Sequence, residues 1–104
     1  MLPKNKRVTK ELFQRIMKTG GSLASPFFSF RYINSDKPQY AFVAPKSVAK
    51  RAVDRNKLRR IGYNNLNSFT LKNISGIFFY KKQGKNVSSQ EIKKDIENLL
   101  KRIK

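Results

Sequence analysis

The stretch GIFFYKKQG, residues 76–84, decides the fold. Its aromatic and aliphatic run at residues 77–80 lies between a glycine and a turn-forming segment in which lysine and glutamine precede a second glycine. A short apolar run bounded in this way is typical of a strand buried on both faces. We therefore expect residues 77–80 to form the middle of a sheet, with the rest of the chain arranged around them.

The clearest helix follows this strand. Ser88 and Glu91 stand three residues apart and fit a capping box at the start of the helix. Apolar residues then recur at helical spacing, which predicts a stripe that packs on the sheet. The stripe consists of Ile92, Ile96, Leu99, Leu100 and Ile103.

A β-hairpin is predicted upstream of the central strand. Residues 26–33 are rich in aromatic side chains, and residues 34–38 are a cluster of turn formers. Residues 39–44 favour β-structure again and are expected to be the return strand of the hairpin.

Two more helices complete the pattern. Thr9 can cap a helix over residues 10–19, and Gly20 is a natural stop. A helix is also expected within residues 48–66, although its apolar residues scatter around the helical wheel and Gly62 interrupts its end.

The element order is therefore α-β-β-α-β-α. A chain of 104 residues is long enough for one α+β domain with a core, in which helices pack against one sheet as a sandwich. We expect a single domain over residues 1–104, with residues 1–8 as a basic N-terminal arm.

The charge of the chain points to an anionic partner. Lys and Arg number 24 against 6 Asp and Glu, which gives a formal net charge of +18. Nucleic acid, an anionic membrane surface and an acidic protein would all satisfy this charge, and nucleic acid is favoured.

The composition argues against catalysis by protein side chains. The chain contains neither Cys nor His, so it lacks disulfides, thiolate metal sites and the commonest acid–base side chain. We expect no catalytic residue and no metal site in the protein. Because no apolar segment has the length of a signal peptide core or a membrane span, we expect a cytoplasmic protein that does not contact a membrane.

The segment PKSVAKRAVDRNKLRR, residues 45–60, concentrates the basic residues. Arg51, Arg55 and Arg59 are four residues apart, so one helix face presents three guanidinium groups. Guanidinium matches phosphate oxygens in a bidentate manner, although on charge alone a solvated basic face is about equally favoured. The candidate RNA-binding residues are Lys46, Lys50, Arg51, Arg55, Asn56, Lys57, Arg59 and Arg60.

The order of residues in AVDRNKLRR, residues 52–60, resembles the signature of the bacterial ribonuclease P protein family. In that signature a small residue is followed by Arg-Asn, a basic residue, an aliphatic residue and a basic pair. Residues 2–22, 77–80 and 91–100 also resemble the family, so the likeness covers nearly the whole chain. The chain departs from the family pattern at Gln39, at Ser47 and at residues 62–65.

The resemblance implies a fold similar to the second domain of ribosomal protein S5, with a left-handed β-α-β crossover against the general rule. It also implies that the protein is a subunit of an endoribonuclease that removes the 5′ leader of precursor tRNA. The implied partners are the catalytic RNA and precursor tRNA, with no small-molecule substrate. The catalytic RNA would perform the hydrolysis and hold most of the Mg²⁺.

The resemblance further implies a cleft for the single-stranded leader between the first helix and the sheet. Aromatic side chains beside basic ones suit unpaired bases. The residues implied are Phe13, Met17, Phe28, Phe30 and Tyr32. The hydrophobic core is the favoured alternative for Phe28 and Phe30, Phe13 is evenly balanced, and the register leaves open whether Arg31 or Tyr32 faces the cleft.

Two other functions compete with this interpretation. A ribosomal protein or general RNA chaperone would explain the charge and the aromatic residues, but not the context of Arg55 and Asn56. A stand-alone nuclease would need a metal bound by carboxylates, and these are spread along the chain. They are Asp36, Asp54, Glu91, Asp95 and Glu97.

Overall fold

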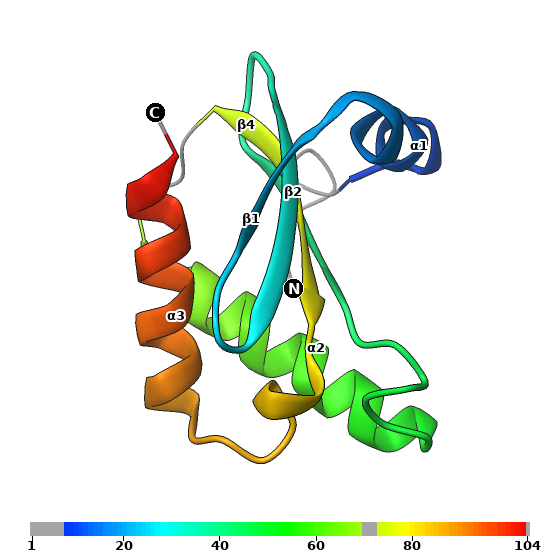
Figure 1. The fold of residues 1–104 in the computed structure, drawn as a ribbon, viewed down its shortest axis with the longest axis vertical. Coiled ribbons are helices and arrows are strands. Elements are labelled where there is room, and N and C mark those ends of the chain that lie inside the picture. Colours follow the sequence, from blue (N-terminus) through cyan, green and yellow to red (C-terminus); the bar gives the residue numbers. More distant parts are fainter. Residues whose placement is uncertain (1–7, 70–72, 104) are drawn as a thin grey trace.

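Three α-helices and a four-stranded sheet make up residues 8–69 and 73–103, the part of the chain that the computed structural model describes (Figure 1). The elements are α1 (Lys10–Thr19), β1 (Gly21–Ala24), β2 (Phe28–Asn34), β3 (Gln39–Val43), α2 (Ala52–Leu66), β4 (Ile74–Tyr80) and α3 (Ser89–Arg102), with a short 3-10 helix at Lys82–Gly84. The predicted basic arm lies outside the described residues except for its last residue, Val8.

The sheet has the strand order β1-β2-β4-β3. β4 is antiparallel to β2 and parallel to β3, so that Phe78 lies opposite Phe30 on one side and Phe42 on the other. The prediction of a central strand at residues 77–80 is confirmed. The predicted hairpin of residues 26–33 and 39–44 is wrong, because β4 lies between β2 and β3 in the sheet. β4 is the most apolar strand, and in this position both of its edges are paired.

The hairpin partner of β2 is instead β1, a strand that the sequence pattern did not indicate. The element order is therefore α-β-β-β-α-β-α within the α+β sandwich. The parallel pair β3 and β4 is connected through α2, which is the β-α-β crossover that the family resemblance implied. The left-handedness of this crossover stays a prediction.

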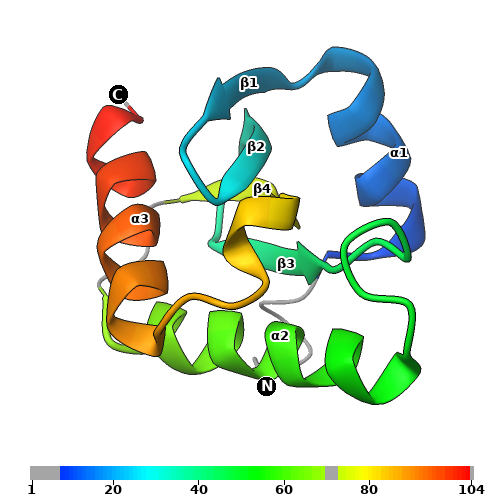
Figure 2. The same cartoon turned by 60° about the horizontal axis from the view of Figure 1, so that its bottom comes forward.

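The two faces of the sheet are covered differently (Figure 2). α2 and α3 contact each other and enclose the main core with the aromatic side chains of the strands. All five residues of the predicted stripe on α3 are buried there. α1 packs on β2 and β4 at the opposite face, where Ile16 and Ile77 are fully buried outside the main core.

The predicted helix signals are confirmed at both ends of the chain. The Thr9 hydroxyl accepts a hydrogen bond from the backbone N–H of Leu12, which caps α1. Ser88 and Glu91 form the capping box of α3. α2 begins at Ala52 rather than near Val48, because residues 45–51 form turns that place Val48 in the core.

Candidate nucleic-acid interface

α2 carries most of the candidate RNA-binding residues and is held firmly on the sheet. The Tyr80 hydroxyl donates a hydrogen bond of 2.6 Å to the carbonyl of Leu58, and the Tyr63 hydroxyl accepts one of 3.3 Å from the backbone N–H of Phe42. Burial raises the pKa of Tyr80 above its ordinary value, so its hydroxyl keeps the proton that it donates. Two phenols from different elements therefore fix the position of α2.

The end of α2 is the segment at which the chain departs from the family pattern. Gly62 lies so close to β3 that a Cβ atom there would be 2.5 Å from the ring of Phe42. The Asn65 amide donates to the backbone oxygen and the hydroxyl of Ser89 at the start of α3, at 3.2 and 3.1 Å. This segment therefore packs α2 against its neighbours.

The three arginines of the predicted row differ in their surroundings. Arg51 is the N-cap residue of α2 and its side chain is 77% exposed. Arg55 is half-buried, and its Nη1 donates to the carbonyls of Ala49 and Lys50 at 3.1 and 2.7 Å. Arg59 is exposed and donates to the side-chain oxygen of Asn56. Arg55 thus shapes the turn before α2, while Arg51 and Arg59 are open to a ligand.

The other candidates lie around α2 and are all exposed. Lys46 and Lys50 belong to the turns before the helix. A groove of about 630 Å³, which we call the α2 groove, runs along one side of the helix. It is lined by Phe42, Val53, Asn56, Arg59, Arg60 and Tyr63. Lys57 lies on the other side of α2, so the signature residues surround the helix rather than form one row.

A second groove, of about 650 Å³, lies beside α1. We call it the α1 groove, and it is lined by Met17, Ser22, Leu23, Ala24, Ser29, Phe30, Arg31, Phe79 and Arg102. Arg31 Nη2 donates to the carbonyl of Met17 at 2.9 Å, and its buried Nε has no hydrogen-bond partner among the described residues. Arg102 Nη1 donates to the carbonyl of Ala24 at 2.7 Å. Two guanidinium groups therefore border a groove with apolar walls.

Two of the five predicted cleft residues belong to this side of the sheet. Met17 is 39% exposed and lines the α1 groove. Phe13 is half-buried, and its ring meets the ring of Phe79 edge to face with centroids 6.2 Å apart. The structure therefore brings these two residues of α1 together with β4.

The structure places Phe28, Phe30 and Tyr32 in or against the main core rather than in an open cleft. Phe28 and Phe30 have no exposed surface, and the Tyr32 ring stacks on Phe30 on the sheet face that α2 and α3 cover. Phe30 borders the α1 groove without exposing any atom to it. Because successive residues of a strand face opposite sides, Arg31 is the residue that faces α1.

The alternation along β2 could have indicated which of its residues face α1. Since Phe28 and Phe30 share the core face, Ser29 and Arg31 must share the other face with α1. The same argument applied to β4 places Phe79 opposite to Phe78. Sequence reasoning missed Ser29, Phe79 and Arg102, and left Arg31 as an alternative.

The turn between β1 and β2, at one wall of the α1 groove, is fixed by a buried carboxylate on α3. Asp95 Oδ2 accepts hydrogen bonds from the Ser25 hydroxyl at 2.5 Å and from the backbone N–H of Phe27 at 3.0 Å. Lys81 Nζ donates to the carbonyl of Ser25 at 2.9 Å. Asp95 is therefore committed to this turn.

The remaining carboxylates do not gather into a metal site. Within residues 8–69 and 73–103 no group of three or more acidic side chains is placed to hold a metal ion. Glu91 belongs to the capping box, and Glu97 forms an ion pair of 2.9 Å with Lys101, which lowers the pKa of that carboxyl. The geometry therefore gives the nuclease alternative no support.

The family model for ribonuclease P matches residues 2–104 of the chain. The chain belongs to the ribonuclease P protein family. The resemblance seen at residues 52–60 is therefore confirmed, and a role in tRNA processing follows from the family.

Solved ribonuclease P proteins share the fold. One structure of the Staphylococcus aureus protein is 25% identical, covers 92% of this chain and 93% of its own, and has a TM-score of 0.81. A second structure of the Staphylococcus aureus protein is 28% identical, covers 97% of this chain and 91% of its own, and has a TM-score of 0.75. The Thermotoga maritima protein has a TM-score of 0.84 at 22% identity, covering 94% and 97%. No curated protein matches the chain in sequence.

None of the helices that the structure describes is long and apolar enough to cross a membrane.

Proposed function

We propose that this ribonuclease P protein binds the catalytic RNA through α2 and the single-stranded 5′ leader of precursor tRNA through the α1 groove. The observation that carries the proposal is the family match together with the exposed basic residues that surround α2. The ribosomal-protein and chaperone alternatives explain the charge, but they do not explain the match over residues 2–104.

The surface around α2 suits an RNA backbone. Arg51, Arg59 and Arg60 are exposed, and their guanidinium groups can each make two parallel hydrogen bonds to a phosphate. Tyr80 and Tyr63 already hold α2 on the sheet, so the spacing of the three guanidinium groups is set before the RNA binds. Binding therefore does not have to meet the entropic cost of ordering the helix. Binding through phosphates weakens steeply with salt, because each neutralised phosphate releases counterions.

The α1 groove suits an unpaired strand. Met17 and Phe79 offer apolar surface on which bases can pack, and stacking of a base on an aromatic ring contributes about 1–3 kcal/mol without sequence preference. Arg31 and Arg102 lie in the same groove and supply charge for the phosphates. The groove therefore combines the two properties that recognition of single strands requires.

The chemistry is assigned to the RNA subunit. The protein contains neither His nor Cys, and its described carboxylates are dispersed or committed to structural hydrogen bonds. We assign Mg²⁺ mainly to the RNA and no catalytic residue to the protein. The holoenzyme works in the cytoplasm on precursor tRNA, without a membrane or a small-molecule substrate.

Reconstitution tests the proposal. The chain is combined with a bacterial ribonuclease P RNA at low Mg²⁺ concentration, and cleavage of precursor tRNA is measured beside protein-alone and RNA-alone controls. We expect cleavage at the 5′ leader junction only where the RNA is present, and faster cleavage where the protein is present too. An unchanged rate on adding the protein would reject the proposed role.

A further inference from the structure

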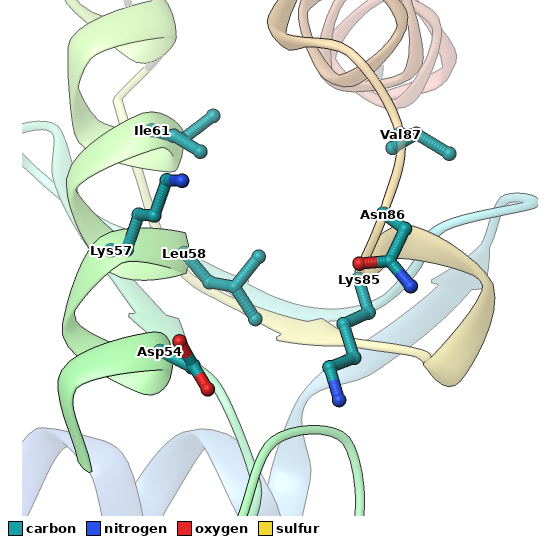
Figure 3. Close-up of a pocket in the computed structure, with 7 residues that line it drawn as sticks. All are labelled: Asp54, Lys57, Leu58, Ile61, Lys85, Asn86 and Val87. Atoms are coloured by element: carbon teal, nitrogen blue, oxygen red, sulfur yellow. The ribbon is translucent and has the colours of Figure 1, made fainter. Parts of the chain in front are cut away.

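A third pocket lies on the side of α2 that the two grooves leave free. It is enclosed by α2 and by residues 85–87, which connect the 3-10 helix to α3, and its volume is about 410 Å³ (Figure 3). Pockets for small ligands have volumes of roughly 300–1,000 Å³, so this space can take one nucleotide but not a folded helix of RNA.

The pocket has an apolar floor and polar walls. In Figure 3 the side chain of Leu58 projects from α2 toward the facing segment. Asp54 and Lys57 line the α2 side of this space, and Lys85 and Asn86 line the other side. Leu58 is 6% exposed, whereas both lysines are exposed. A base can therefore lie on the floor while its phosphate remains at the rim, within reach of the exposed lysine side chains.

Asp54 lies in the first turn of α2, where a carboxylate stabilises the positive end of the helix, and its side chain also lines the pocket and remains 44% exposed. It is the one acidic residue of α2, and a carboxylate there opposes the attraction of phosphates. Its ion pair with Arg51 is long, at 4.0 Å, and joins side chains that are 44% and 77% exposed, so it contributes little to stability. A ligand that presents hydrogen-bond donors would make use of this carboxylate.

We propose that this pocket holds one unpaired guanine nucleotide of the bound RNA. An ionised carboxylate only accepts hydrogen bonds, and the guanine edge presents two adjacent donors, N1–H and the N2 amine, that match its two oxygens. The corresponding edges of adenine, cytosine and uracil each place acceptors beside their donor. Asn86 carries an amide that can donate to the guanine O6, and Lys57 and Lys85 are exposed at the pocket, where their flexible side chains can reach a phosphate.

The RNA is the source of the nucleotide because the protein carries a net charge of +18 and the pocket adjoins the basic surface of α2. The inference thus rests on the proposed binding of the catalytic RNA. A free guanine nucleotide has the same chemistry, and the experiment separates the two sources.

Inosine interference tests the proposal, because inosine is guanosine without the N2 amine. The catalytic RNA is transcribed with occasional inosine phosphorothioates and bound to the full chain, and iodine cleavage maps the bound and unbound fractions. We expect at least one guanosine position at which inosine is depleted from the bound fraction by roughly 10-fold, the loss expected for one hydrogen bond to a charged acceptor. Asp54→Asn replaces two acceptors with one acceptor and one donor, so it should markedly reduce this depletion, and it should lower the melting temperature only slightly through loss of a charge in the first turn of α2.

Asp36→Asn is the matched control, because Asp36 is exposed in the turn between β2 and β3 and its substitution changes the charge equally. It should keep the wild-type pattern. An unchanged pattern in Asp54→Asn, or no inosine-sensitive position, would overturn the inference while leaving the proposed function intact. Failure of the wild-type chain to bind the RNA would reject both. Asp54-dependent binding of guanosine 5′-monophosphate at micromolar concentration without RNA would overturn the RNA source.

Discussion

Arg31 is the residue whose substitution most directly tests the α1 groove. It lies on β2 with its side chain toward α1, where one of its nitrogens holds the carbonyl of Met17 and another is buried without a partner among the described residues. Arg31→Met keeps an unbranched side chain of similar length and removes the charge and all the donors. The substitution therefore separates packing from phosphate binding.

The expected effect on binding exceeds the expected effect on folding. Because the hydrogen bond to the carbonyl of Met17 is exposed to water, which can replace the lost donor, its loss should lower the free energy of unfolding by only about 0.5–1.5 kcal/mol. Loss of a charged hydrogen bond to a leader phosphate should weaken binding by about 1.5–3 kcal/mol, which is roughly 10- to 150-fold in Kd. Mature tRNA has no leader, so its affinity should remain nearly unchanged.

The assay compares precursor and mature tRNA binding to the reconstituted holoenzyme, by fluorescence anisotropy in one buffer. Arg15→Met is the matched control, because Arg15 is an exposed arginine of α1 that does not line the α1 groove. It should not change the ratio of the two affinities. Equal losses for precursor and mature tRNA in Arg31→Met would refute the assignment of the leader to this groove.

Three further predictions concern residues that hold α2 on the sheet or fix the turn beside the α1 groove. Gly62→Ala should lower the free energy of unfolding by about 2 kcal/mol, which urea unfolding measures. Crowding of the new methyl group against Phe42 costs about 3 kcal/mol, and the better helix propensity of Ala offsets about 1 kcal/mol of this. Asp95→Ala should cost about 1–3 kcal/mol by leaving the backbone N–H of Phe27 unpaired, since the Ser25 hydroxyl can still donate to the carbonyl of Phe28, and near-wild-type stability would contradict this. Tyr80 has a raised pKa, so its contribution to stability is complete below the ordinary value of 10.0 and falls at higher pH. The difference in melting temperature between wild type and Tyr80→Phe should therefore narrow above pH 10.

The helices and the central strand could be predicted because their signals are local. Thr9 and the pair Ser88 and Glu91 satisfy backbone donors within one turn, so the ends of α1 and α3 follow from a few neighbouring residues. Residues 77–80 form an uninterrupted apolar run, so side chains on both faces of the strand are apolar. This pattern is typical of a strand in the middle of a covered sheet. The structure confirms each of these features.

The order of the strands could not be predicted because it depends on partners far along the chain. The turn formers at residues 34–38 do reverse the chain, but β4 then takes the place between β2 and β3. β1 has the sequence GSLA, which has little β propensity of its own, and it is a strand because β2 offers it an edge. Propensity therefore located the strands that bury aromatic residues and missed the one that does not.

The faces of β2 show the same limit at the site. Alternation indicates that Phe28, Phe30 and Tyr32 share one face, but not which helices cover that face. The structure shows that α2 and α3 cover it, which leaves Arg31 for the face of α1. A shift of one residue in register therefore moves the predicted cleft from one side of the sheet to the other.

The departures from the family pattern at the end of α2 now have a physical interpretation. Gly62 lets the helix approach Phe42, Tyr63 bonds the same residue through its hydroxyl, and Asn65 bonds Ser89. A larger side chain at position 62 would have to displace the Phe42 ring, which stacks on Phe78 with centroids 4.7 Å apart. The end of the helix is thus taken up by packing contacts, and the basic residues of α2 all lie before it, within residues 55–60. We therefore expect RNA phosphates to contact residues 46–60 and not the end of α2.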